Sequence, residues 1–243
     1  MKTVDVPGAF LNAELPDLVH MTLVGPMADI LIEIAPSVYK PFASKNKKDE
    51  TVLVVVLTKA LYGCILSSLR WWIQLSNVLK DMDFVPNPYD PCVVNKVING
   101  TQCTIAWHVD DLKISHKDEK VVDQVISSLE SVYGPLAVDT GLFHTYLGID
   151  FDYSVSGEVS VSMINYFKDI VSDFPDELKQ VNTPAGVHLF DVNENPTLLD
   201  KTKADLFHQI VAKFLWGSLR CRPDLMLALS FLTSRVQYPD TDD

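Results

Sequence analysis

Hydrophobic and polar positions in the first half of the chain follow two spacings, one typical of strands and one typical of helices. Short apolar and β-branched runs bounded by turn residues predict strands over 3–6, 51–57, 92–97, 101–107 and 112–115. The Asn99-Gly100 pair between two of these runs is a strong signal for a tight hairpin. Apolar positions three and four residues apart predict helices over 70–82 and 118–133, the second capped by Asp118. The first half of the chain therefore mixes strands with helices.

The second half of the chain carries weaker patterns. We expect a strand pair and three helices there: the strands cover 145–152 and 158–163, and the helices cover 164–174, 201–216 and 223–237. Residues 175–200 contain three prolines and little periodicity, which is typical of a linker. The sequence therefore predicts two regions, 1–133 and 134–243, with this linker inside the second.

Composition places the chain among ordinary globular proteins. Of its 243 residues, 47% are hydrophobic and 21% are charged, so it can bury a sizeable core. Its four cysteines contain no C-x-x-C pair, which argues against a disulfide scaffold or zinc ribbon and favours a reducing compartment. The first residues lack a secretory pattern, and the best membrane candidate, 51–69, is short and contains Lys59. We therefore expect a cytoplasmic protein with no membrane partner.

The net charge of −12 comes mainly from one segment. Residues 121–200 contain thirteen acidic and two basic side chains, and the rest of the chain is nearly neutral. Phosphate contacts depend on Lys and Arg, so this balance argues against an extensive nucleic-acid-binding face. An acidic interaction domain is one interpretation of such a composition.

Adjacent carboxylates at Asp110-Asp111 fall at the tip of a predicted hairpin. Two ionised carboxylates at a tight turn repel each other unless water or a cation screens them. An exposed Asp pair is common in turns, so the pair is not diagnostic by itself. Asp5 ends the first predicted strand and can join the pair if both strands share one antiparallel sheet. Such an oxygen-rich pocket matches Mg²⁺, and two ions about 4 Å apart would suit in-line phosphoryl transfer.

Five short motifs carry a resemblance to a known family. They are DVPGAFLN at 5–12, KALYG at 59–63, VDD at 109–111, YLGI at 146–149 and RPD at 222–224. In order and rough spacing, and over nearly the whole chain, they are similar to the reverse transcriptases of Ty1/copia-type LTR retrotransposons. No P-loop, dinucleotide-binding or serine-hydrolase motif competes with this interpretation.

The resemblance implies an α+β fold and a polymerase activity. The fold would be a right-hand palm whose antiparallel ferredoxin-like sheet is backed by helices. A partial fingers insertion would lie at about 20–57, and a thumb-like or connection-like region would follow from 134. The activity would be RNA-directed DNA polymerisation with two Mg²⁺ ions. The implied partners are an RNA or DNA template with its primer and deoxynucleoside triphosphates.

The resemblance also assigns residues to the site. Asp5 and Asp110 correspond to metal ligands and Asp111 to the third, supporting carboxylate of the catalytic set. Phe10 resembles the aromatic steric gate that closes against a ribose 2′-hydroxyl. The neighbouring motif residues that would contact substrate are Ala9, Tyr62 and Gly63.

Several positions depart from the family pattern. His108 stands where the family usually has Tyr before Val-Asp-Asp, and 64–70 lacks the usual basic residue and proline. We also expect the fingers sequence before Asp5 and the RNase H region to be missing. These departures leave open a catalytically inert remnant of such an element. Trp71, Trp72 and Trp216 could stack on bases, but their helical spacing favours the core.

Overall fold

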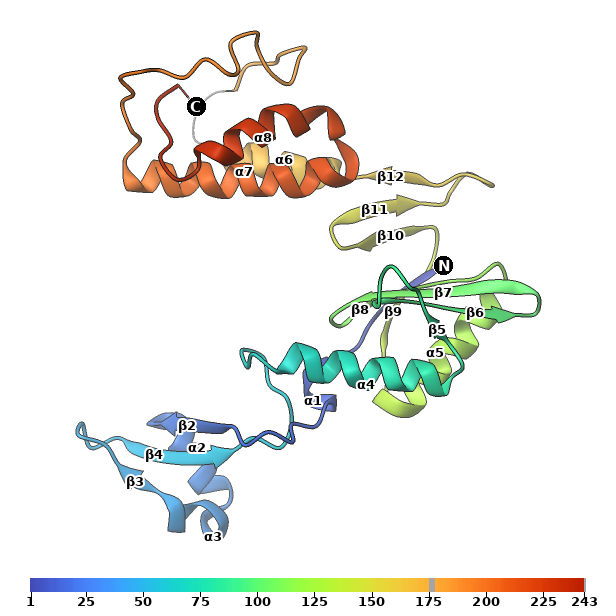
Figure 1. The fold of residues 1–243 in the computed structure, drawn as a ribbon. Coiled ribbons are helices and arrows are strands. Elements are labelled where there is room, and N and C mark those ends of the chain that lie inside the picture. The colour runs from blue at the N-terminus through green and yellow to red at the C-terminus, as the bar shows by residue number, and fades with distance from the viewer. Residues whose placement is uncertain (175–177, 243) are drawn as a thin grey trace. The chain divides into compact units, whose positions relative to one another are not determined.

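The computed structural model describes residues 1–174 and 178–242, and its contacts divide the chain into two units, Met1–Gly141 and Leu142–Asp243 (Figure 1). The sequence-based division after residue 133 lies before strand β9 (Ala137–Asp139). This strand pairs with β1 (Lys2–Asp5) and so belongs to the first unit.

A six-stranded antiparallel sheet forms the centre of the first unit, in the order β5-β6-β7-β8-β1-β9. Its other strands are β5 (Val85–Pro86), β6 (Val93–Ile98), β7 (Thr101–His108) and β8 (Asp111–Ser115). Helix α4 (Ser67–Asp81) lies between β1 and these strands in the chain, and α5 (Glu119–Tyr133) connects β8 to β9. The chain order β1-α4-β7-β8-α5-β9 with the sheet order β7-β8-β1-β9 is ferredoxin-like. The α+β palm fold expected from the sequence is thus confirmed.

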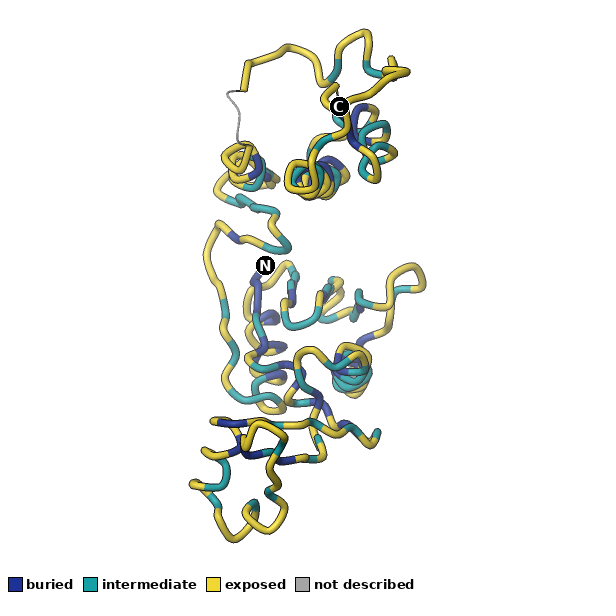
Figure 2. The backbone as a smooth tube through the Cα atoms, turned by 90° about the vertical axis from the view of Figure 1, so that its left-hand side faces the viewer, coloured by how far each residue is buried: buried dark blue, intermediate teal, exposed yellow. Residues whose placement is uncertain are grey.

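Alternation along the strands decides which face of the sheet the helices cover. In β7, Cys103, Ile105 and Trp107 are buried, whereas the residues between them are more exposed. Side chains two apart share a face, so these three point to the side on which α4 and α5 lie (Figure 1). They join one hydrophobic cluster whose buried members on α4 and α5 are Trp71, Leu75, Leu79, Val121, Val122, Val125, Ile126 and Leu129. Figure 2 shows buried positions of the chain in dark blue and exposed loops in yellow.

Local signals explain how several of these elements begin and end. Asn99 and Gly100 both have positive φ, 51° and 75°, in the predicted turn between β6 and β7. The Asp118 side chain caps α5 by accepting a hydrogen bond from the Lys120 backbone N–H at 3.0 Å. Helix α4 begins at Ser67, earlier than expected, and the buried Ser67 hydroxyl both accepts from and donates to the backbone of Leu61.

A smaller antiparallel sheet in the first unit occupies the expected fingers insertion. Its strands, in the order β2-β4-β3, are β2 (His20–Val24), β4 (Thr51–Val56) and β3 (Ser44–Lys45). The helices of this insertion are α2 (Pro26–Ile34) and α3 (Pro36–Tyr39), whereas α1 (Ala9–Asn12) precedes the insertion and packs against α4. A short 3₁₀ turn, Lys40–Phe42, follows α3.

The second unit combines a three-stranded antiparallel sheet with helices. Its elements are β10 (Phe143–Tyr146), β11 (Ile149–Asp152), β12 (Ser160–Ser162), α6 (Ile164–Ser172), α7 (Lys201–Cys221) and α8 (Met226–Arg235). The single strand expected over 145–152 is wrong, because Leu147 and Gly148 turn the chain between β10 and β11 with φ of 52° and 74°.

Two helix ends in the second unit also differ from expectation. Helix α7 continues through Gly217 to Cys221 rather than ending at 216. The last predicted helix starts as a 3₁₀ turn, Pro223–Leu225, and α8 ends at Arg235. Residues 178–200 contain no helix or strand in the part of the linker that the structure describes. Among the described residues, no helix is long and apolar enough to cross a membrane.

Candidate active site

Backbone pairing brings the three predicted catalytic carboxylates together. Asp5, the last residue of β1, pairs in register with Asp111, the first residue of β8. The Val6 backbone N–H donates to the Asp110 carbonyl at 3.0 Å, which holds the turn beside the end of β1. The next pair along the two strands, Val4 and Leu112, is buried toward the helices. Asp5 and Asp111 therefore lie on the opposite, open face of the sheet.

The turn that presents these carboxylates differs slightly from the predicted one. His108 pairs with Asp111, so the two residues of the turn are Val109 and Asp110, and Asp111 already belongs to β8. Val109 has a φ of 56°, which is left-handed and unfavourable for a β-branched residue. The indole N–H of Trp71 on α4 donates to the Val109 carbonyl at 2.6 Å.

The electrostatics of the cluster reflect the crowding of like charges. Partial burial raises the pKa of Asp5, and the charges of Asp110 and Asp111 raise it further. Partial burial also raises the pKa of Asp111, as does the Asp110 charge, while the nearby His108 opposes this shift. A positive charge beside the cluster would therefore favour the charged forms of Asp5 and Asp111.

The predicted substrate residues lie beside this cluster or beneath it. The Tyr62 hydroxyl donates to Asp110 Oδ2 at 3.0 Å, and its ring centroid lies 4.5 Å from that of Phe10. Burial and the hydrogen bond to Asp110 raise the pKa of Tyr62. Phe10 is itself buried, and Ala9 is wholly enclosed in the core. Gly63 follows Tyr62 with a φ of 92°, a left-handed conformation that favours glycine.

The donor chemistry of the cluster fits hard divalent cations, because carboxylate oxygens are the ligands that Mg²⁺ prefers. The side chains, however, are not positioned as a complete metal site. Within 1–174 and 178–242, no three His, Cys, Asp or Glu side chains are grouped so as to hold a metal ion. One oxygen of Asp110 is instead engaged by Tyr62.

The structure shows two features that sequence reasoning missed. Helical spacing identified Trp71 as a core residue, but it could not show that its N–H reaches the carboxylate turn. The run at 64–70, which departs from the family pattern, mixes exposed and buried positions. In the structure Ile65 is 94% exposed, whereas Ser67 is buried and bonded to Leu61.

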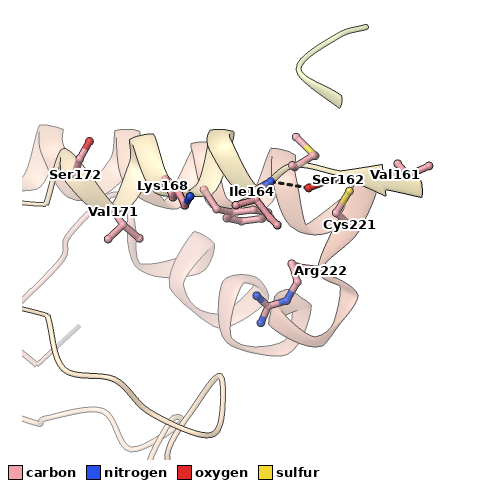
Figure 3. Close-up of a pocket in the computed structure, with 10 residues that line it drawn as sticks. Val161, Ser162, Ile164, Lys168, Val171, Ser172, Cys221 and Arg222 are labelled. Atoms are coloured by element: carbon pink, nitrogen blue, oxygen red, sulfur yellow. Dashed lines mark hydrogen bonds between the residues drawn. The ribbon is translucent and has the colours of Figure 1, made fainter. Parts of the chain in front are cut away.

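A separate cavity lies in the second unit, with a volume of about 570 Å³ (Figure 3). Its walls come from β12, α6 and the end of α7, and they include Met163, Phe167 and Val171. Arg222 also lines it and donates two hydrogen bonds to Asp224, at 2.8 and 2.7 Å. The carboxylate cluster belongs to the first unit, so this cavity is not part of it.

Comparison with known proteins points in the same direction as the carboxylate geometry. A family model described as reverse transcriptase (RNA-dependent DNA polymerase) matches residues 1–186. A transposon Ty5-1 protein of Saccharomyces cerevisiae is 24% identical over 239 residues, which cover 97% of this chain and 70% of that protein. The retrovirus-related Pol polyprotein from transposon RE1 of Arabidopsis thaliana is also 24% identical, over 98% of this chain but only 15% of its own length.

Among solved structures, the chain is similar to a foamy viral protease-reverse transcriptase in complex with double-stranded DNA. The TM-score is 0.44 with 11% identity, over 98% of this chain and 35% of the other. The family assignment rests on the sequence match, which covers well over half of the chain and includes the motifs at 5–12 and 109–111. The chain accordingly belongs to the reverse transcriptase (RNA-dependent DNA polymerase) family of retrotransposons.

Proposed function

We propose that this chain extends a primer 3′-hydroxyl with deoxynucleoside triphosphates on an RNA or DNA template. The observation that carries the proposal is the pairing of Asp5 with Asp111 beside Asp110, on the face of the palm sheet opposite the helices. The family match supports the same reaction class.

Asp5 and Asp110 are the residues that would hold two Mg²⁺ ions, with Asp111 as the supporting carboxylate. When bound, such ions stabilise the charge that develops on the attacking and leaving oxygens of a phosphoryl transfer. The raised pKa values of Asp5 and Asp111 support this role, because a cluster of repelling carboxylates is stabilised by a divalent cation.

Phe10 and Tyr62 are the residues that would select and place the nucleotide. The Tyr62 hydroxyl fixes one oxygen of Asp110, and its ring packs on Phe10. A sugar placed against this pair would meet Phe10 at its 2′ position, so the ring would exclude a hydroxyl there.

Primer extension with an Asp110→Asn variant tests the proposal. We expect Mg²⁺-dependent extension of a DNA primer on an RNA template by the unaltered protein, and extension at background level by the variant. Asp81→Asn is the matched control, because it makes the same charge change on the exposed C-terminal turn of α4. Circular dichroism would verify that all three proteins are folded.

Two outcomes would contradict the proposal. Folded, unaltered protein that fails to extend at any Mg²⁺ concentration would support the inert remnant. Equal extension by Asp110→Asn and the unaltered protein would move the chemistry away from this cluster.

A further inference from the structure

Trp71 links the helical layer of the palm to the carboxylate turn. Its side chain is 1% exposed and belongs to the hydrophobic cluster under the sheet. The ring meets that of Tyr133 on α5 edge to face, at 5.2 Å between centroids. From this fixed position its indole N–H donates to the Val109 carbonyl at 2.6 Å. A buried indole N–H needs such a partner, and here the partner is the residue before Asp110.

Val109 is the residue of the turn that most needs support. It is β-branched and held at a φ of 56°, a conformation that is sterically unfavourable for an L-residue other than glycine. Its side chain packs against the core cluster, so the turn cannot relax freely toward solvent. A strained residue persists only when its surroundings hold it in place.

The Val109 carbonyl is a sensitive point at which to hold the turn. The peptide unit is planar, so its oxygen and the Cα of Asp110 move together as one rigid plane. Fixing the oxygen therefore fixes the direction in which the chain enters Asp110. On the other side of the turn, the Val6 N–H holds the Asp110 carbonyl at 3.0 Å. The Asp110 backbone is thus held from both sides.

We propose that Trp71 is a positioning residue for the carboxylate cluster. Its N–H stabilises the left-handed conformation of Val109 and thereby sets the orientation of Asp110 and Asp111 relative to Asp5. The role in cation binding rests on the proposed polymerase function, whereas the coupling between Trp71 and Val109 does not.

The neighbouring Trp72 offers a matched control. It lies on the same helix and is partly buried against the same cluster. Its side chain acts on the Cys92 thiol, where it opposes the rise of the pKa that burial causes. Trp71→Phe and Trp72→Phe therefore make the same chemical change, and both keep an aromatic ring, but only the first removes the donor to Val109.

A double-mutant cycle in urea unfolding tests the coupling. Glycine adopts the left-handed region at no steric cost, so a chain with Val109→Gly depends less on the Trp71 donor. We expect Trp71→Phe to raise the unfolding equilibrium constant more in the Val109 chain than in the Val109→Gly chain, by a factor of at least about three. If the effects of Trp71→Phe and Val109→Gly on the unfolding equilibrium constant are additive, the inference is wrong. Each variant is compared with its own folded baseline.

Titration with Mn²⁺ alone, followed by the electron paramagnetic resonance of the free ion, tests the positioning. The cluster's contribution is the part of the total Mn²⁺ binding that is lost in Asp110→Asn. We expect Trp71→Phe to lower the Mn²⁺ affinity of this Asp110-dependent binding by about tenfold, a typical effect of losing a residue that orients ligands. Trp72→Phe should leave it unchanged, and the Trp71→Phe, Val109→Gly double variant should regain part of it.

The outcomes separate the inference from the function on which it rests. If the unaltered protein binds Mn²⁺ through Asp110 and Trp71→Phe binds it equally well, Trp71 does not position the cluster and the inference fails alone. If the unaltered protein neither binds Mn²⁺ nor extends primers, the proposed function fails, and the unfolding cycle still decides whether Trp71 supports Val109.

Discussion

Some residues of the candidate site could be predicted from the sequence, and others could not. Asp5, Asp110 and Asp111 were predictable as neighbours, because a strand ending in one carboxylate and a hairpin carrying two others pair simply in an antiparallel sheet. The contact from Trp71 to Val109 was not predictable, since spacing reports that a residue is buried but not where its N–H points. The strain at Val109 was equally hidden, because valine usually signals an extended strand.

The predicted role of Phe10 in sugar selection can be tested by substitution. Because its ring packs on Tyr62 beside Asp110, Phe10→Val should open space for a 2′-hydroxyl and raise the incorporation of ribonucleotides relative to deoxyribonucleotides. The measurement is primer extension with each nucleotide class in turn.

The control for Phe10→Val is another core phenylalanine. Phe84 is buried in the same cluster, so Phe84→Val loses comparable core packing. It should lower stability without altering sugar selection. Unchanged selection in Phe10→Val, or the same change in both variants, would remove the gate assignment.

Whole helices and strands were predictable where a short-range signal defines their ends. Asn99-Gly100 marks the turn between β6 and β7, and Asp118 marks the start of α5; both elements lie where expected. The hairpin of β10 and β11 was missed because Leu147 is not a residue that usually adopts a left-handed turn. The predicted end of α7 at residue 216 is too early. Glycine often follows the last residue of a helix, but Gly217 lies inside α7.

Gly217 provides the prediction for packing between elements. A Cβ at this position would lie 2.6 Å from Cζ of Phe167 on α6, whose ring also contacts Tyr166 and Phe214. Gly→Ala inside a helix normally stabilises by about 1 kcal/mol, but overpacking costs about 1–3 kcal/mol. We therefore expect Gly217→Ala to lower the urea midpoint of the second unit.

A compensating change checks that the cause is the Phe167 ring. Adding Phe167→Leu to Gly217→Ala should recover part of the loss. Gly186→Ala is the control, because nothing lies within 4 Å of its added Cβ and Gly186 lies outside the helices. A stabilising effect of Gly217→Ala alone would show that α6 and α7 have room to move apart.

For the molecule as a whole, charge limits how it can hold a nucleic acid. The net charge is −12, and two of the basic groups near the motifs are paired with carboxylates within the chain. Lys2 pairs with Glu119 and Asp123, and Arg70 pairs with Asp17. These ammonium and guanidinium groups are therefore poorly available to phosphates.

We expect weak binding of a primer–template duplex, with a dissociation constant of about 10⁻⁴–10⁻⁶ M at physiological salt, the range of non-specific contacts. Fluorescence anisotropy of a labelled RNA–DNA duplex, titrated at several salt concentrations, measures it. The slope against salt reports the number of phosphates contacted. Nanomolar binding at physiological salt would show that the acidic segment at 121–200 does not oppose the duplex.

The position of β1 in the sheet has a consequence for biosynthesis. This strand lies between β8 and β9, although it leaves the ribosome long before either. It has no permanent partner until residues 111–115 and 137–139 have emerged, and pairing across such a long intervening loop is slow. Asp5 can therefore join the other carboxylates only after β8 has been synthesised. A nascent chain that stops short of β8 has β1 without its sheet partners and lacks Asp110 and Asp111, so it cannot assemble the carboxylate cluster.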